Sequence, residues 1–270
     1  VFPEMALTTF FPRWYIEDEA ELDAFYETEM PSNETQPLFD LSKQLGVGFY
    51  LGYSEMFFDD TGKKRRFNTA ILVNQQAEIV GKYRKVHLPG HATYEPEREW
   101  QHLEKGYFEV GDLGFPVFRT MGGVMGMCLC NDRRWPETWR VMGMQDVDIV
   151  MLGYNTPVYN SIAPESPHLR MFHNHISMQA GAYQNGTWAV GTAKAGMEGG
   201  VDMMAGSCII APTGEIVALA TTSEDEVIVA ECDLDKGRYI RDTVFNFAQH
   251  RRIENYGVIT ERTEAIAPPE

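Results

Sequence analysis

The sequence from Val124 to Cys130 is an apolar run that ends at a cysteine and gives way at once to polar and cationic residues. A short apolar run of this kind is typical of a buried strand. Directly after it, residues 136–144 have the pattern of a helix. A thiol at the end of a buried strand and just before a helix start lies where negative charge is favoured. Cys130 is therefore a candidate nucleophile.

The other predicted elements alternate between strands and helices. The spacing of apolar residues predicts helices over 18–30, 36–45, 169–184 and 233–242. Further strands are predicted over 47–53, 67–73, 79–90, 117–119, 148–155, 188–193, 207–211, 216–220 and 227–232. No repeat or linker interrupts this pattern. We therefore expect one α/β (α+β) domain over residues 1–257, followed by a polar, Pro-rich tail over 258–270.

The charge balance limits the partners of the chain. Its 270 residues include 39 acidic and 23 basic ones, for a formal net charge of −16. Without an excess of Lys and Arg, we expect neither a nucleic acid nor a membrane as a partner. The irregular cysteine spacing favours reduced thiols in a cytoplasmic protein over a disulfide framework. The cysteines are Cys128, Cys130, Cys208 and Cys232.

A glutamate follows a strand-like start of the chain. Val1 and Phe2 have strand character, Pro3 ends the strand and Glu4 comes next. A glutamate in this position is either a solvated loop charge, which is the commoner case, or a carboxylate of a site.

A lysine lies near the end of the predicted strand over 79–90. Strand periodicity places Lys85 on one face together with Tyr83 and His87. This face is either the rim of a site or part of an edge strand whose lysines discourage aggregation. The two interpretations are equally good on the residues alone.

Three motifs together resemble the nitrilase superfamily of carbon–nitrogen hydrolases. They are Phe2-Pro3-Glu4, residues 81–88 and residues 130–137, in the order and with the spacing of that superfamily. The resemblance is closest to the N-carbamoyl-D-amino-acid amidohydrolases, or D-carbamoylases, whose motifs are similar to residues 6–14, 85–91, 101–105 and 153–157. Members of that family have a further strand and helix before this start. We therefore expect those elements to be missing upstream of Val1.

The resemblance implies a four-layer α-β-β-α sandwich that forms a homo-oligomer, a dimer or a tetramer. It also implies catalysis without a metal or an organic cofactor. In the implied mechanism, Cys130 attacks the substrate, Glu4 transfers the proton and Lys85 stabilises the oxyanion, which are roles that these residue types can fill. A second glutamate, Glu104, is implied to orient Lys85 and the substrate.

The arginines after Cys130 bear on the choice of substrate. An N-carbamoyl amino acid has a free carboxylate, which guanidinium groups bind through two parallel hydrogen bonds. Arg133 and Arg134 are therefore candidate carboxylate ligands, although a structural salt bridge explains either residue equally well. The other substrate-binding candidates are polar residues of the motifs, namely Asn131, His87, His102, Asn155 and Thr156.

We therefore expect a small-molecule substrate with a carboxylate, an N-carbamoyl-D-amino acid, hydrolysed to the D-amino acid, ammonia and carbon dioxide. The D preference comes from the resemblance alone. One alternative is another amidohydrolase of the superfamily, acting on N-carbamoyl-β-alanine, N-carbamoylputrescine or a simple amide. Another alternative is an inactive binding module.

Three histidines of the predicted helix region have partly metal-like spacing. They are His168, His173 and His175, and no carboxylate completes a ligand set with them in the sequence. We therefore expect these histidines to pack at a helix interface and expect no metal site.

Overall fold

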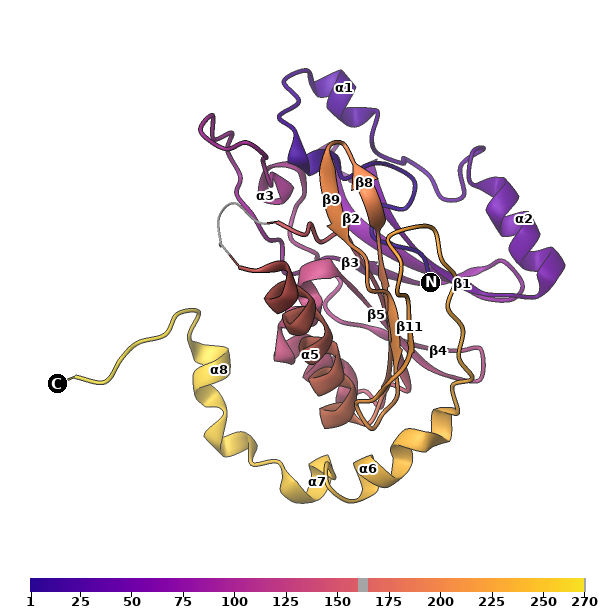
Figure 1. Cartoon of the computed structure of the whole chain (residues 1–270), viewed down its shortest axis with the longest axis vertical. Coiled ribbons are helices and arrows are strands. Elements are labelled where there is room, and N and C mark those ends of the chain that lie inside the picture. Colours follow the sequence, from indigo (N-terminus) through magenta and orange to yellow (C-terminus); the bar gives the residue numbers. More distant parts are fainter. Residues whose placement is uncertain (160–164, 270) are drawn as a thin grey trace.

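The computed structural model describes residues 1–159 and 165–269, and its strands form two large sheets and a short ribbon (Figure 1). The strands are β1 (Phe49–Phe58), β2 (Lys64–Val73), β3 (Ile79–Arg84), β4 (Val117–Thr120), β5 (Gly123–Leu129), β6 (Ile149–Tyr154), β7 (Trp188–Ala193), β8 (Ala195–Glu198), β9 (Val201–Met204), β10 (Cys208–Ile210) and β11 (Ile216–Leu219). One sheet has the order β1-β2-β3, the second has the order β11-β10-β7-β6-β5-β4, and β8 pairs with β9. The pairs β5–β6 and β6–β7 are parallel.

The helices cover the outer faces of the sheets and form the C-terminal part of the chain. The α-helices are α1 (Glu19–Asp23), α2 (Gln36–Leu45), α3 (Glu104–Tyr107), α4 (Pro136–Gly143), α5 (Pro167–Asn185), α6 (Arg238–Asp242), α7 (Phe247–His250) and α8 (Gly257–Glu261). The 3-10 helices are η1 (Phe11–Arg13), η2 (Cys130–Arg134), η3 (Leu234–Gly237) and η4 (Ile253–Asn255).

The main core lies between the two large sheets. Tyr50 and Leu72 of the first sheet share one buried cluster with Met127 and Leu152 of the second. The alternate residues of β1 and β2 point the other way, and there they pack against Phe39 of α2. Helices α4 and α5 pack together on the far side of the second sheet. The layers therefore follow the predicted α-β-β-α order.

Several predicted elements are confirmed. Helix α2 has the predicted bounds, and it ends because Gly46 adopts the left-handed conformation with φ 65°. Helix α5 covers the predicted 169–184. The strands predicted over 67–73 and 79–90 pair as the hairpin β2–β3, and those predicted over 207–211 and 216–220 pair as β10–β11.

Several predictions were wrong. The helix expected over 18–30 stops at Asp23, because Glu27 leaves the helical path to form a bridge with Glu55 of β1. The strand expected over 227–232 does not form, and Val227 is 89% exposed. An apolar run without a neighbouring strand to accept its hydrogen bonds does not build a ladder. The short helix α3 lies in a stretch for which no helix or strand is predicted.

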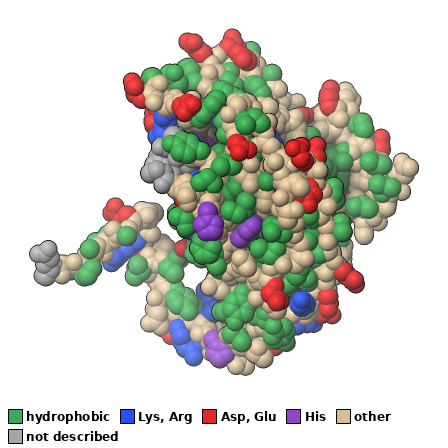
Figure 2. Space-filling model, in the orientation of Figure 1, with side chains coloured by type: hydrophobic (Ala, Val, Ile, Leu, Met, Phe, Trp, Pro, Cys, Tyr) green, Lys and Arg blue, Asp and Glu red, His purple; other side chains and the backbone are tan. Residues whose placement is uncertain are grey.

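The chain from α6 to α8 runs along and then away from the sheets (Figure 1). We call residues 238–269 the C-terminal arm. Its side chains are largely exposed, including Ile253 and Ile259. Several of the basic side chains visible in Figure 2 lie on or beside this arm. Glu270, the last residue of the predicted tail, lies outside the described residues.

Candidate active site

The structure brings Glu4, Lys85 and Glu104 into direct contact. The Lys85 Nζ lies 2.8 Å from Glu4 Oε1 and 2.6 Å from Glu104 Oε2. All three side chains are fully buried, and Cys130 beside them is 8% exposed. Four candidates from separate parts of the sequence therefore form one buried cluster.

Two glycines allow Glu4 to lie between the large sheets. A Cβ on Gly153 of β6 would come within 2.3 Å of the Glu4 nitrogen, and one on Gly52 of β1 would come within 3.1 Å of its Cα. The segment is also tied to β1, because the amide of Ala6 donates to the carbonyl of Gly52. Phe2 donates to Tyr50 in the same way, although the first residues do not form the predicted strand.

The end of β3 aims Lys85 into the same space. Burial alternates along this strand, so Tyr83 and Lys85 are buried while Lys82 and Arg84 are only partly buried. The partly buried pair bonds to Glu55 on the other side. The strand ends at Arg84 instead of continuing to residue 90, and His87 is only partly buried, so the predicted alternation of faces is confirmed only as far as Lys85.

Cys130 lies at a sharp turn. It follows β5 directly and begins the 3-10 helix η2. Its φ of 44° is in the left-handed region, which a residue with a side chain adopts only at a cost of about 1–3 kcal/mol. Strained residues of this kind gather at functional sites. The turn changes the direction of the chain at the thiol, as the sequence predicts.

The charges of the cluster set its protonation. Burial alone lowers the pKa of Lys85, but Glu104 and Glu4 outweigh it and raise the pKa, so the ammonium stays charged. Burial opposes ionisation of Glu104, but Lys85 and His102 hold its pKa below the usual range. Burial and Glu4 raise the pKa of Cys130, against the opposite effect of Lys85 and Arg133. The resting thiol is therefore protonated at neutral pH and needs a base before it can attack.

Two asparagines hold Glu4. The Asn68 side chain donates 2.8 Å to Glu4 Oε1, and the Asn155 amide donates 3.2 Å to Glu4 Oε2. The Asn155 side chain also bonds to the Glu4 carbonyl. Asn155 therefore contacts Glu4, whereas the sequence predicts a contact with substrate. Asn68 was missed, although an asparagine inside the apolar strand 67–73 was a visible signal.

Asp132 was also missed by the sequence analysis. Its buried carboxylate accepts hydrogen bonds from the Leu129 amide, the Tyr83 hydroxyl and the His87 amide. The His87 ring nitrogen Nδ1 lies 2.8 Å from the same carboxylate. Through these hydrogen bonds, Asp132 links the turn at Cys130 to His87, two residues after Lys85. An acid two residues after a candidate nucleophile was the available signal.

The two arginines have different surroundings. Arg133 is 1% exposed and bonds to protein groups through each guanidinium nitrogen. Arg134 is half-buried, and no carboxylate of the described residues pairs with it. Burial and the neighbouring Arg133 lower the pKa of Arg134 to about 10, so it remains cationic at neutral pH.

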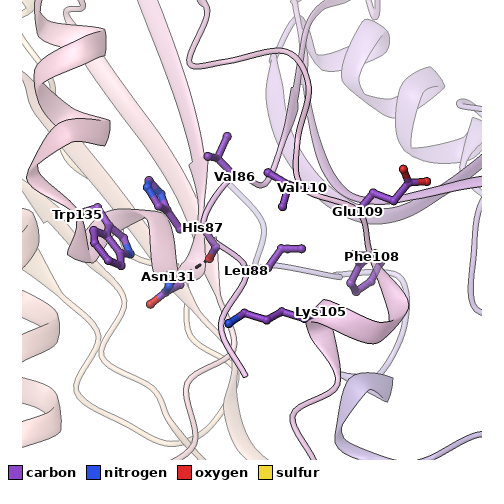
Figure 3. Close-up of a pocket in the computed structure, with 9 residues that line it drawn as sticks. All are labelled: Val86, His87, Leu88, Lys105, Phe108, Glu109, Val110, Asn131 and Trp135. Atoms are coloured by element: carbon purple, nitrogen blue, oxygen red, sulfur yellow. Dashed lines mark hydrogen bonds between the residues drawn. The ribbon is translucent and has the colours of Figure 1, made fainter. Parts of the chain in front are cut away.

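The remaining predicted substrate contacts lie around this cluster. Thr156 accepts a 3.0 Å hydrogen bond from Arg133, and the His102 ring lies 3.2 Å from Glu104. His87 and Asn131 line a cavity of about 760 Å³ that lies beside the cysteine turn (Figure 3). His87 stacks on Trp135 there, with ring centroids 4.9 Å apart.

No cluster of three or more His, Cys, Asp or Glu side chains within residues 1–159 and 165–269 has the arrangement of a metal site. His175 of α5 bonds to the carbonyl of Gly206, and His173 pairs with Glu165. The contact of His175 matches the expected interface role, whereas His173 pairs with a residue just before its own helix. In the part of the chain that the structure describes, no helix is long and apolar enough to cross a membrane. All four cysteines are free thiols.

The known proteins that resemble this chain include two relatives of similar extent. The chain is 29% identical over 229 residues to a nitrilase of Pyrococcus abyssi, covering 84% of this chain and 76% of the relative. It is 30% identical over 205 residues to an N-carbamoylputrescine amidase of Solanum tuberosum, covering 73% of this chain and 63% of the relative. The chain thus spans less than two thirds of the second relative. Neither is named a D-carbamoylase, so that finer resemblance stays a prediction.

Comparison with solved structures gives the same fold. A carbon–nitrogen hydrolase from Helicobacter pylori matches with a TM-score of 0.81 at 23% identity, over 96% of this chain and 85% of that one. An amidase from Nesterenkonia sp. AN1, with acrylamide added at its active-site cysteine, matches with a TM-score of 0.64 at 20% identity, over 92% and 84%. The predicted sandwich is therefore confirmed. Because the family model for carbon–nitrogen hydrolases also matches residues 1–242, the chain belongs to the carbon–nitrogen hydrolase family.

Proposed function

We propose that the protein hydrolyses an N-carbamoyl-D-amino acid through a covalent intermediate on Cys130. The observation that supports the substrate class is the half-buried Arg134, a cation close to the thiol that forms no direct ion pair with a carboxylate of the described residues, since the nearby Glu165 pairs with Arg170. A buried charge is costly unless a partner neutralises it. The carboxylate of an N-carbamoyl amino acid is a partner of the right charge and geometry.

The buried cluster supports the first half of the reaction. Glu4 takes the proton from the Cys130 thiol, and Sγ attacks the ureido carbonyl carbon. Lys85 donates a hydrogen bond to the oxygen, which becomes negative. A single well-placed donor of this kind stabilises the transition state by about 3 kcal/mol. The bond from carbon to the terminal nitrogen then breaks, and ammonia leaves with the proton that Glu4 held.

Water completes the reaction. Glu4 removes a proton from the water, which attacks the carbonyl carbon of the thioester. The carbon–sulfur bond breaks and the thiol regains its proton. The product is the N-carboxy amino acid, which loses carbon dioxide to leave the free amino acid. Glu104 bonds to Lys85 and has no proton-transfer role in this scheme.

A second candidate substrate is N-carbamoylputrescine, because an N-carbamoylputrescine amidase is 30% identical to this chain. Its far end is an ammonium rather than a carboxylate. Arg133 and Arg134 lie close enough to influence each other, and Arg170 near them pairs with Glu165. Such a group of cations repels an ammonium and attracts a carboxylate. The charges near the thiol therefore favour the amino acid.

Ammonia release tests the proposal. The wild-type protein is given the D and L forms of one N-carbamoyl amino acid, and N-carbamoylputrescine in parallel. We expect release from the D form, none in Cys130→Ala, and unchanged release in the matched control Cys208→Ala. Equal rates of ammonia release from the D and L forms would refute the D preference, which rests on the motif resemblance. Faster release from N-carbamoylputrescine would favour the second candidate.

Arg134→Gln tests the carboxylate contact. We expect the KM for the carbamoyl amino acid to rise about 10- to 100-fold, as for the loss of a hydrogen bond to a charged group. Arg140 is a suitable control because it also lies on this side of the second sheet, where it packs over Phe247. Arg140→Gln should leave KM unchanged. Intact-mass detection of an adduct on Cys130 separates an enzyme from an inactive binding module.

We also propose a cytoplasmic homo-oligomer, a dimer or a tetramer. The C-terminal arm and the outer side of α5 expose large apolar side chains, including Ile253, Ile259 and Phe172. Contact between copies would remove such surface from water. Light scattering of the purified protein measures the mass, and a monomer at micromolar concentration would contradict this assembly.

A further inference from the structure

The side chain of Arg133 is held by the protein on all sides. Its Nε donates 2.7 Å to Asn174 Oδ1, its Nη1 donates 2.5 Å to the Cys130 carbonyl, and its Nη2 donates 3.0 Å to Thr156 Oγ1. Its guanidinium also lies over the ring of Tyr154, 4.3 Å from the centroid. These partners come from η2, β6, the residues after β6, and α5.

Each of these contacts uses a group that substrate would otherwise engage. A bidentate carboxylate contact needs two adjacent N–H groups in one plane with free access. Every guanidinium nitrogen of Arg133 already donates, and the residue is 1% exposed. Its surroundings are those of a structural cation.

The contact with Cys130 concerns the backbone as well as the thiol. The carbonyl that Arg133 binds belongs to the residue with φ 44°, which is the strained point of the turn. A strained conformation persists only when its surroundings hold it. The same Nη1 lies 3.8 Å from the Cys130 Sγ. One guanidinium thus contacts both the backbone and the sulfur of the nucleophile.

We propose that Arg133 is a positioning residue for Cys130 and does not bind the substrate carboxylate. It holds the left-handed turn by binding the carbonyl, and its charge favours the thiolate. Arg134 is then the one arginine of the pair that faces substrate. This inference rests on the proposed role of Cys130 as nucleophile.

The surrounding charges agree with this division. Arg133 and Lys85 both act to lower the pKa of Cys130, while burial and the carboxylates of Glu4 and Glu104 raise it. Removing the Arg133 charge removes one of the cations that favour the thiolate. The pKa of the thiol should therefore rise further in such a variant.

The test compares Arg133→Gln with Arg134→Gln in two measurements. The first is the ultraviolet absorbance of the Cys130 thiolate against pH, taken as the difference from the same protein carrying Cys130→Ser. The second is kcat and KM for N-carbamoyl-D-alanine and for its carboxamide, which lacks the carboxylate. Arg140→Gln serves as the control for loss of a partly buried arginine.

For Arg133→Gln we expect the thiolate midpoint to rise by about one pH unit. We expect kcat to fall at least about tenfold on both substrates with KM unchanged. For Arg134→Gln we expect a smaller shift of the midpoint than for Arg133→Gln, and a higher KM for the carboxylate alone. A higher KM for the carboxylate alone in Arg133→Gln, with an unmoved midpoint, would overturn the proposal.

Arg133→Lys covers the case in which Arg133→Gln does not fold. Lysine keeps the charge but cannot reach three acceptors at once. We expect a thiolate midpoint near that of the wild type and a lower kcat on both substrates, and a wild-type kcat would contradict the positioning role. If the wild-type protein hydrolyses neither substrate, the proposed function fails, while the titration still decides whether Arg133 acts on the thiol.

Discussion

Asn68 connects the two charged residues of the candidate site, because its side chain donates to Glu4 Oε1 at 2.8 Å while its carbonyl accepts from the Lys85 amide at 2.8 Å. The residue is fully buried in β2. One asparagine thus holds Glu4 through its side chain and Lys85 through its backbone. A single strand thereby sets the distance between the two groups.

Asn68→Ala should lower kcat by about 10- to 100-fold. The variant keeps the backbone contact to Lys85 but loses a hydrogen bond to the Glu4 carboxylate, and bonds to charged groups contribute about 1.5–3 kcal/mol. Steady-state kinetics of ammonia release measure the effect. Asn74→Ala is the matched control, because Asn74 follows the same strand but bonds to Glu78 at the turn. Equal losses in both variants would mean that the effect is not local to Glu4.

Gly153→Ala should damage both stability and activity. The added methyl group would lie 2.3 Å from the Glu4 nitrogen, so the segment carrying the base must move. Overpacking of this kind costs about 1–3 kcal/mol. Urea denaturation and kcat measure the two effects. Gly114→Asn is the control, since its Cβ meets nothing within 4 Å and Asn tolerates a φ of 64°. Full activity in Gly153→Ala would show that activity does not depend on the position of Glu4 against β6.

Glu104→Gln should remove a pH-dependent part of the stability. The folded pKa of Glu104 is lowered, so its ionised form stabilises the fold above the ordinary pKa of about 4.3, and this contribution is lost as the pH falls through the folded value. At pH 7 the variant should lose about 3–5 kcal/mol, because Lys85 loses a buried partner.

Urea denaturation at pH 7 and pH 3 measures this effect of Glu104. The wild type should lose more stability than Glu104→Gln between the two values. The exposed Glu97 provides the control, and Glu97→Gln should follow the wild type. An acid dependence in Glu104→Gln equal to that of the wild type would rule out this role for the Glu104 charge.

The thiolate of Cys130 should appear only above the ordinary cysteine pKa of about 8.5, because burial and Glu4 raise its pKa. The ultraviolet difference between wild type and Cys130→Ser, followed from pH 6 to pH 11, measures this titration. Cys208→Ser is the control for a second buried thiol. A thiolate already present at pH 6 would contradict a resting thiol that depends on a base.

The sequence by itself was sufficient for the local elements of this protein. Helix α2 follows from its apolar spacing and from Gly46, and the β2–β3 hairpin from two apolar runs around a turn. The alternation that buries Lys85 is a property of any strand. The pattern ending at Cys130 likewise indicated both the strand and the turn. These features depend on neighbours within a few residues, which the sequence displays directly.

Only the tertiary structure decided which distant residues meet. Glu4 and Asn68 are 64 residues apart, and their contact depends on how the first segment passes between two sheets. Arg133 and Arg134 differ in their surroundings because Asn174 and Thr156 bind Arg133. No local sequence pattern connects these two residues to Cys130. The strand expected over 227–232 does not form, because strand propensity alone cannot supply a neighbouring strand to pair with. Whether such a neighbour exists depends on the tertiary structure.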